Sequence, residues 1–130
     1  MFLDTSGLYA LLDASESRHL AAKEAFERSH LLFTHAYVLA ELVPLAQARG
    51  VPRLLALRFI STLMQTGEVE IIWVDRELHE SAHQLLLSRA DKTYSLCDAV
   101  SFVLMRQRGQ SEALTTDHHF QQEGFLRLLP

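Results

Sequence analysis

Four acidic residues lie in apolar stretches of this sequence and could do chemistry together: Asp4, Glu41, Asp98 and Asp117. Carboxylates brought within a few ångströms of one another repel, and their pKa values rise unless a cation neutralises them. Hard oxygen ligands, with no cysteine and no obligatory histidine among them, select Mg²⁺ or Mn²⁺ over zinc. Such a site supports phosphodiester hydrolysis, because the ion activates water and stabilises the leaving oxygen. The four acids are therefore candidate metal ligands and candidate catalytic residues.

Glu41 has the fewest local explanations among these acids. It lies in the middle of a predicted helix, and positions 37, 38, 42 and 45, one turn away on either side, are all apolar. These neighbours predict a partly buried carboxylate, which is costly unless it is paired. No lysine or arginine lies within one helical turn of Glu41. Its partner must therefore be a metal ion or an arginine that is distant in the sequence.

The other three acids each have a structural alternative as helix caps. Asp4 and Asp117 precede predicted helices, and aspartate is a favoured N-cap residue. Ser95 and Asp98 have the spacing of a capping box, in which the two side chains satisfy backbone amides at a helix start. The hydroxyl residues beside the acids could support them, because a hydroxyl can bond a carboxylate or a phosphate oxygen. These residues are Thr5, Ser95 and Thr115.

Short apolar segments alternate with segments of helical periodicity along the chain. Strands are predicted at residues 2–3, 31–34, 69–74, 113–116 and 125–129. Helices are predicted at 5–12, from a cap at Ser15, at 36–48 with a kink or restart at Pro44, from Pro52 to Gly67, and at 75–88, 95–108 and 117–122. This alternation is typical of βαβ units. We predict an α/β fold with three layers, α/β/α, around a central, mostly parallel sheet of four or five short strands. Ligands of such sheets bind beyond the carboxyl ends of the strands, where Asp4 and Asp117 fall.

Length, charge and composition limit what kind of protein this is, but they do not by themselves identify its function. The chain has 130 residues and a net charge of −4, so we expect a single domain over residues 1–130 and no general electrostatic coating of nucleic acid. The one cysteine, Cys97, excludes a disulfide within the chain and favours the reducing cytoplasm. The sequence shows no signal-peptide pattern and no apolar run of membrane-spanning length, so no membrane association is expected.

Four motifs, taken in this order, resemble those of PIN-domain ribonucleases, in particular the small VapC-type toxins of prokaryotic toxin–antitoxin pairs. The resemblance covers essentially the whole chain. Each motif is weak alone, but four in the right order in a short α/β chain are specific. They are Phe2-Leu3-Asp4-Thr5-Ser6, Ala40-Glu41-Leu42, Tyr94-Ser95-Leu96-Cys97-Asp98-Ala99, and Thr115-Thr116-Asp117-His118-His119-Phe120 followed by Gly124-Phe125.

The resemblance implies a PIN-like fold and an endoribonuclease whose acidic quartet holds Mg²⁺ or Mn²⁺. By this similarity the quartet is Asp4, Glu41, Asp98 and Asp117. It further implies an RNA substrate, a homodimer, and a small antitoxin protein whose tail blocks the site. The sequence departs from the pattern at one position, because some members carry a further acid where this chain has His119.

Two other functions compete with this interpretation. A non-catalytic module of the same fold would bind RNA or a protein partner without turnover. A zinc protease is suggested by His79-Glu80-Ser81-Ala82-His83, which matches H-E-x-x-H on a predicted helix, but no third ligand follows at the spacing of the extended motif. Among the remaining residues, Trp73 is predicted to be core, and the basic side chains around Gly50 (Arg49, Arg53 and Arg58) are predicted to be solvated surface more than an RNA path.

Overall fold

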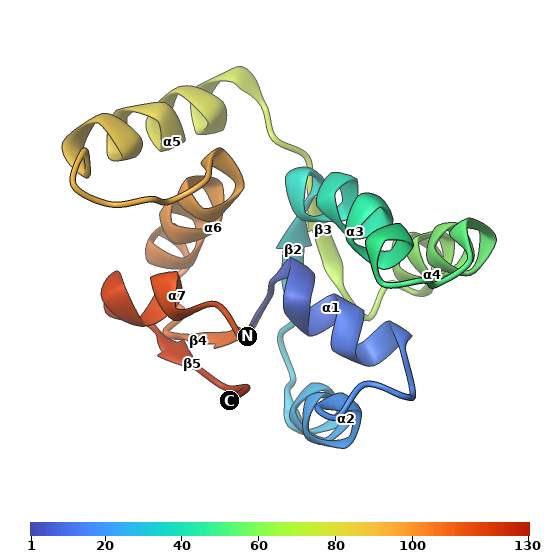
Figure 1. Cartoon of the computed structure of the whole chain (residues 1–130). Coiled ribbons are helices and arrows are strands. Elements are labelled where there is room, and N and C mark those ends of the chain that lie inside the picture. Colours follow the sequence, from blue (N-terminus) through green and yellow to red (C-terminus); the bar gives the residue numbers. More distant parts are fainter.

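Five short parallel strands form the central sheet of the computed structural model, which describes all residues 1–130 (Figure 1). The strand order is β3-β2-β1-β4-β5. Phe2 and Leu3 of β1 are fully buried, as expected for the central strand of a sheet covered on both faces. The strands are β1 (Phe2–Leu3), β2 (Phe33–His35), β3 (Glu70–Ile72), β4 (Glu112–Leu114) and β5 (Leu126–Arg127).

Seven helices cover the two faces of the sheet and confirm the predicted three-layer α/β/α architecture (Figure 1). One layer holds α1 to α4 and the other holds α5 to α7. None of these helices combines the length and the apolar character needed to cross a lipid bilayer. The helices are α1 (Thr5–Leu12), α2 (His19–Arg28), α3 (Ala36–Ala48), α4 (Arg53–Thr66), α5 (Arg76–Ser88), α6 (Leu96–Gln107) and α7 (His118–Gln122).

The strand order places a topological switch point between β1 and β4. From β1 the chain winds through β2 to β3 on one side, whereas β4 is followed by β5 on the other. All pairs are parallel, so the carboxyl ends of the strands share one edge. Asp4 follows β1 and Asp117 comes after β4. These two acids therefore flank the crevice in which open α/β sheets bind their ligands.

Some local predictions were wrong because tertiary contacts override local pattern. Ser15 does not cap α2, which starts at His19; its amide and hydroxyl bond the Asp13 carboxylate in a turn instead. Helix α3 runs through Pro44 as one helix, so of the two outcomes predicted there the restart does not occur. Trp73 is not core, because its side chain follows the edge strand β3 and is 64% exposed. Several large apolar side chains of α4 also lie open, including Leu54 at 56% and Met64 at 49%.

Gly7 is the residue that lets α1 lie against β4, and its replacement by alanine is expected to destabilise the fold. A Cβ atom there would lie 2.0 Å from the backbone oxygen of Leu114, so α1 and β4 must separate. We expect a loss of about 3 kcal/mol or more in the free energy of unfolding, measured by urea denaturation. Gly50→Ala is the matched control. Its site has space but a φ of +82°, so its loss should be about 1 kcal/mol.

Candidate functional site

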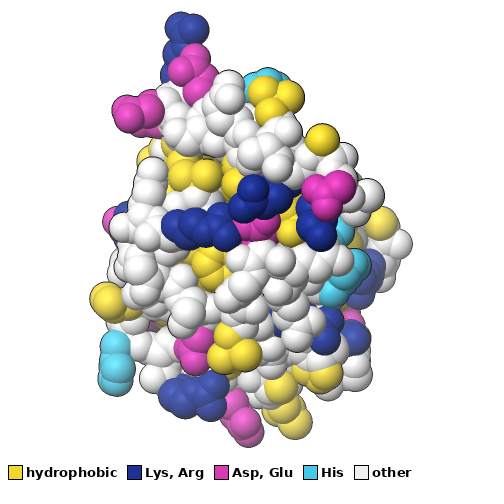
Figure 2. Space-filling model, turned by 90° about the vertical axis from the view of Figure 1, so that its left-hand side faces the viewer, with side chains coloured by type: hydrophobic (Ala, Val, Ile, Leu, Met, Phe, Trp, Pro, Cys, Tyr) yellow, Lys and Arg dark blue, Asp and Glu magenta, His cyan; other side chains and the backbone are white.

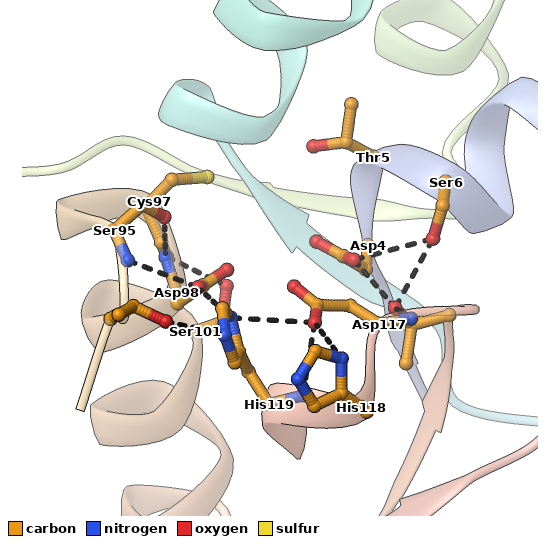
Figure 3. Close-up of polar contacts among 12 residues, drawn as sticks. Asp4, Thr5, Ser6, Ser95, Cys97, Asp98, Ser101, Asp117, His118 and His119 are labelled. Carbon is orange, nitrogen blue, oxygen red and sulfur yellow. Dashed lines mark hydrogen bonds and ion pairs between the residues drawn. The ribbon is translucent and has the colours of Figure 1, made fainter.

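All four predicted acids line one cleft of about 360 Å³ at the carboxyl edge of the sheet. Each comes from a different element: Asp4 from the end of β1, Glu41 from the middle of α3, Asp98 from the first turn of α6, and Asp117 from the start of α7. Figure 3 shows that the carboxylates of Asp4, Asp98 and Asp117 face a common space. The remaining lining residues are Thr5, Ser6, Pro44, Leu45 and Arg49.

Asp4 is the buried centre of the cleft and does not act as a helix cap. It occupies the N-cap position of α1, yet its side chain bonds no amide of that helix. Instead the Thr115 hydroxyl donates to Asp4 Oδ2 at 2.6 Å, and Ser6 Oγ lies 3.5 Å from the same oxygen. Burial, opposed in part by the Thr115 hydrogen bond, raises the pKa of Asp4 to about 7. The carboxylate is held in place, but its charge is not neutralised.

Asp98 and Asp117 do cap helices and line the cleft as well. Asp98 Oδ2 accepts the Ser95 amide at 3.1 Å while the Ser95 hydroxyl accepts the Asp98 amide at 3.0 Å, which confirms the predicted capping box. Asp117 Oδ1 accepts the His119 amide at 2.9 Å. Burial raises the pKa of Asp98, and the nearby Asp117 charge adds to the shift. The capping bonds orient both carboxylates without supplying a cation.

Glu41 is more exposed than its apolar neighbours predicted. Val38 and Leu42 are buried, but Glu41 lies at the border of that face and opens into the cleft. Its carboxylate accepts the Thr5 hydroxyl at 3.3 Å. Its pKa is raised, chiefly by desolvation of the carboxylate against the cleft wall, while the bonds from Cys97 and Thr5 oppose the shift. The side chain as a whole is thus half in solvent, whereas its acidic end faces the other three acids.

No lysine or arginine neutralises this cluster. The only ion-pair contacts of the four carboxylates are with two histidines, His118 and His119. The alternative that a distant arginine pairs with Glu41 is therefore wrong. Burial raises the pKa values of Asp4, Glu41 and Asp98. Their hydrogen-bond partners are hydroxyls, backbone amides, an imidazole and the Cys97 thiol, so the cluster fits a hard divalent cation held by oxygen ligands.

His119 lies inside the acidic cluster. Its Nδ1 atom is 3.1 Å from Asp98 Oδ2 and 3.3 Å from Asp117 Oδ1 (Figure 3). Its Nε2 atom is 3.1 Å from the Thr93 hydroxyl. An ionised carboxylate only accepts hydrogen bonds, so Nδ1 carries the proton in these contacts. His119 thereby bridges two acids that would otherwise only repel.

The adjacent His118 also lies close to the acids. Nitrogen and oxygen atoms of Asp117, His118 and His119 lie within 4.8 Å of one another. The two rings are 4.7 Å apart at their centroids, because α7 starts at this point and has only five residues. The side chain of His118 is nevertheless 65% exposed, compared with 16% for His119. His118 thus lies at the rim and His119 within the cluster.

A buried histidine ties together the helices that carry Glu41 and Asp98. His35 ends β2, and its Nδ1 accepts the Val38 amide at the start of α3. Its Nε2 lies 2.8 Å from the hydroxyl of Ser101 on α6, and that hydroxyl donates to the Cys97 carbonyl. Burial lowers the pKa of His35 to about 4. The ring is therefore neutral at pH 7 and donates from Nε2, which fixes α3 against α6.

Two further polar residues of the site went unrecognised in the sequence. Ser6 Oγ lies 3.1 Å from Thr115 Oγ1 and accepts the Thr116 amide at 2.9 Å, so it joins α1 to the end of β4. Its place two residues after Asp4 was a signal, because a hydroxyl there can reach the same strand edge. Arg49 was assigned to solvated surface, whereas its side chain lines the cleft.

The zinc-protease motif forms no equivalent site. His79 and His83 lie on α5, whose buried face is made of Leu78 and Ala82. His79 Nδ1 is engaged by the Tyr37 hydroxyl at 2.6 Å. No third histidine, cysteine or acid completes a metal-binding group with them. The histidines are thus the rim of a helix whose apolar stripe packs on the core.

Replacing His119 by aspartate is expected to destabilise the metal-free protein by about 1–2 kcal/mol. The change removes the donor between Asp98 and Asp117 and adds a third negative charge at that point. Urea denaturation in the presence of a chelator measures the loss. His118→Asp is the control and should change the free energy of unfolding by less than about 0.5 kcal/mol, because that side chain is exposed. Equal losses in the two variants would show that His119 does not bridge the acids.

Comparison with known proteins agrees with this geometry. The PIN domain family matches residues 1–126. The 23S rRNA-specific endonuclease VapC20 of Mycobacterium tuberculosis strains CDC 1551 and H37Rv is 31% identical over 131 residues, spanning 100% of this chain and 98% of the relative. The crystal structure of M. tuberculosis VapC20, described as a sarcin–ricin loop cleaving toxin, superposes with a TM-score of 0.88 at 29% identity, covering 99% and 98% of the two chains. On the motifs, the fold and the extent of these matches, the chain belongs to the PIN-domain family.

Proposed function

We propose that this protein is a metal-dependent endoribonuclease that hydrolyses phosphodiester bonds of RNA, and that it is the toxin of a toxin–antitoxin pair. The observation that carries the proposal is the meeting of four carboxylates, none of them paired with a lysine or arginine, in one cleft at the switch point of the sheet. A non-catalytic binding module has no use for such a cluster, because crowded acids repel an RNA strand and cost stability. Membership in a nuclease family supports the same function.

We assign the metal ligands to Asp4, Glu41, Asp98 and Asp117, and the ion to Mg²⁺ or Mn²⁺. When bound, such an ion supplies charge neutralisation at the phosphate and activation of a water molecule. The protein's own contribution is orientation. Thr115 holds the buried Asp4 carboxylate, whereas Ser95 and the α6 backbone hold Asp98. Thr5 orients Glu41 from the opposite wall.

We propose 23S ribosomal RNA, at its sarcin–ricin loop, as the substrate, by analogy with VapC20. The distribution of surface charges favours RNA recognition through a few individual contacts over binding along an extended basic surface. On the face formed by α5 to α7, Lys and Arg side chains are mixed with acids (Figure 2). Arg89 and Arg106 on this face flank Glu123 at 2.6 and 2.5 Å, so both charges are already paired.

We propose two protein partners, an antitoxin and a second copy of the chain. The open apolar face of α4 supports a protein partner, because Leu54, Leu55 and Met64 are about half exposed, and such patches mark interaction sites. The name of the relative VapC20 is that of a toxin, and a toxin must be held in check until it is needed. We further assign the protein to the cytoplasm, where its RNA substrate lies, and treat residues 1–130 as one nuclease domain.

The direct test is cleavage of purified 23S rRNA and of whole ribosomes in Mg²⁺ or Mn²⁺, with cleavage sites mapped by primer extension. We expect one dominant cut in the sarcin–ricin loop, none in the presence of a chelator, and none with Glu41→Gln. His79→Ala is the matched control and should cleave like the wild type, because that histidine lies outside the cleft. Cleavage that survives the chelator would refute the metal-dependent mechanism. RNA binding without any cleavage would favour the non-catalytic module.

A further inference from the structure

Arg49 is the only basic residue that lines the acidic cleft. Arg53 and Arg58, which are close to it in sequence, lie on the exposed surface of α4 and do not reach the cleft. The three residues look equivalent in the sequence, since all surround the turn at Gly50. The tertiary structure separates them, and it leaves one positive charge at the mouth of a site that carries four negative ones.

The Arg49 side chain is held at this mouth by two contacts. Its guanidinium lies over the ring of Tyr9, 4.9 Å from the ring centroid, and Tyr9 itself is buried on α1. Its Nη1 atom lies 3.8 Å from Glu16 Oε2, too far for a hydrogen bond. Glu16 is engaged at 2.9 Å by Arg18. Stacking on a ring orients a guanidinium without consuming its donors, so the N–H groups of Arg49 stay available to a ligand.

Arg49 is the C-cap residue of α3, whereas Glu41 lies in the middle of that helix. Glu41, Leu45 and Arg49 follow one another at intervals of four residues, so they form a single strip on the cleft wall. Eight residues of helix correspond to about 12 Å. Arg49 is therefore at one end of this strip of the cleft wall, and Glu41 is at the other end.

We propose that Arg49 binds a backbone phosphate of the RNA strand next to the one that is cleaved. This inference rests on the proposed ribonuclease function and adds a positioning residue to it. An acidic cleft repels the phosphates on either side of the scissile bond. A forked cation at the mouth offsets this repulsion, because a guanidinium bonds two phosphate oxygens at once. Contact with a phosphate carries no base specificity, so Arg49 orients the strand and does not read its sequence.

The test measures how RNA binding depends on salt. The probe is a fluorescent single-stranded RNA spanning the sarcin–ricin loop sequence, bound to proteins that also carry Asp4→Asn so that the probe stays intact. Loss of one phosphate contact should reduce the slope of log affinity against log salt by about 0.7. Arg49→Gln should therefore show this smaller slope and about 10-fold weaker binding at low salt. Arg49→Lys should restore the slope, because it keeps the charge.

Controls separate this role from a structural one. Arg53→Gln removes the same charge from outside the cleft and should leave slope and affinity unchanged. In the cleaving protein, Arg49→Gln should raise KM about 10-fold with little effect on kcat. If Arg49→Gln keeps the wild-type slope, the phosphate contact is refuted while the ribonuclease function stands. If the wild type neither binds nor cleaves RNA, the proposed function itself fails.

Discussion

Asp4→Asn is expected to abolish RNA cleavage, by about a thousandfold or more, without unfolding the protein. An amide has nearly the shape of the carboxylate and can still accept the Thr115 hydroxyl. It cannot supply the charge that a divalent cation needs at the centre of the cleft, and a lost interaction of several kcal/mol corresponds to that factor. The measurement is the initial rate of 23S rRNA cleavage in saturating Mn²⁺. Asp91→Asn, an exposed acid elsewhere, should leave the rate unchanged.

The same variant should be more stable than the wild type at high pH when metal is absent. Burial raises the pKa of Asp4 to about 7 from 3.8. Between these two values the folded protein holds a proton that the unfolded chain has lost, so the wild type loses stability as the pH rises through this window. The loss is on the order of 4 kcal/mol at pH 8 and is absent near pH 4. Asparagine does not ionise, so Asp4→Asn should escape it.

Urea denaturation from pH 4 to pH 8.5 in the presence of a chelator distinguishes these expectations. The free energy of unfolding of Asp4→Asn should exceed that of the wild type by an amount that grows with rising pH and is largest above pH 7. If the free energy of unfolding of the wild type stays constant or increases across this pH range, Asp4 ionises without a cost to folding. The cleft would then not require a cation to stabilise the charge of Asp4.

Adding Mn²⁺ at about 100 times its dissociation constant should stabilise the wild type by about 2.7 kcal/mol. For a chain of this size the melting temperature should rise on the order of 10 °C. At one fixed Mn²⁺ concentration, the rise in melting temperature should be smaller at pH 6 than at pH 8. The reason is that the ion must first displace the proton that burial retains on Asp4. Differential scanning calorimetry with and without a chelator measures the effect.

The metal prediction has its own matched variants. Asp4→Asn should remove most of the Mn²⁺ stabilisation, whereas His79→Ala should retain it, because His79 lies on α5 and bonds Tyr37. If zinc stabilises the protein at a one-to-one ratio and Asp4→Asn does not change this stabilisation, the result would favour a zinc site at His79 and His83. Stabilisation by Mn²⁺ that is equal in all variants would indicate nonspecific binding to the acidic surface.

Much of the fold was predictable because it depends on short-range pattern. Short strands of two or three residues alternate with helices, and the alternation of strand and helix patterns in the sequence indicates a parallel sheet between helices. Strand ends carrying Asp4 and Asp117 then had to share an edge. The capping box of Ser95 and Asp98 was equally local, and it formed as predicted. The wrong predictions concerned burial, as for Trp73, which was predicted to lie in the core. Burial depends on which distant elements cover a residue.

The sequence by itself therefore determined the kind of fold, the four acids and the edge at which two of them meet. Only the tertiary structure decided how those acids are held and what surrounds them. Thr115 reaches Asp4 across 111 positions of the chain, His119 enters the cluster between Asp98 and Asp117, and Arg49 alone among its basic neighbours faces the cleft. Such facts depend on which elements pack side by side, and periodicity within one element does not contain that information.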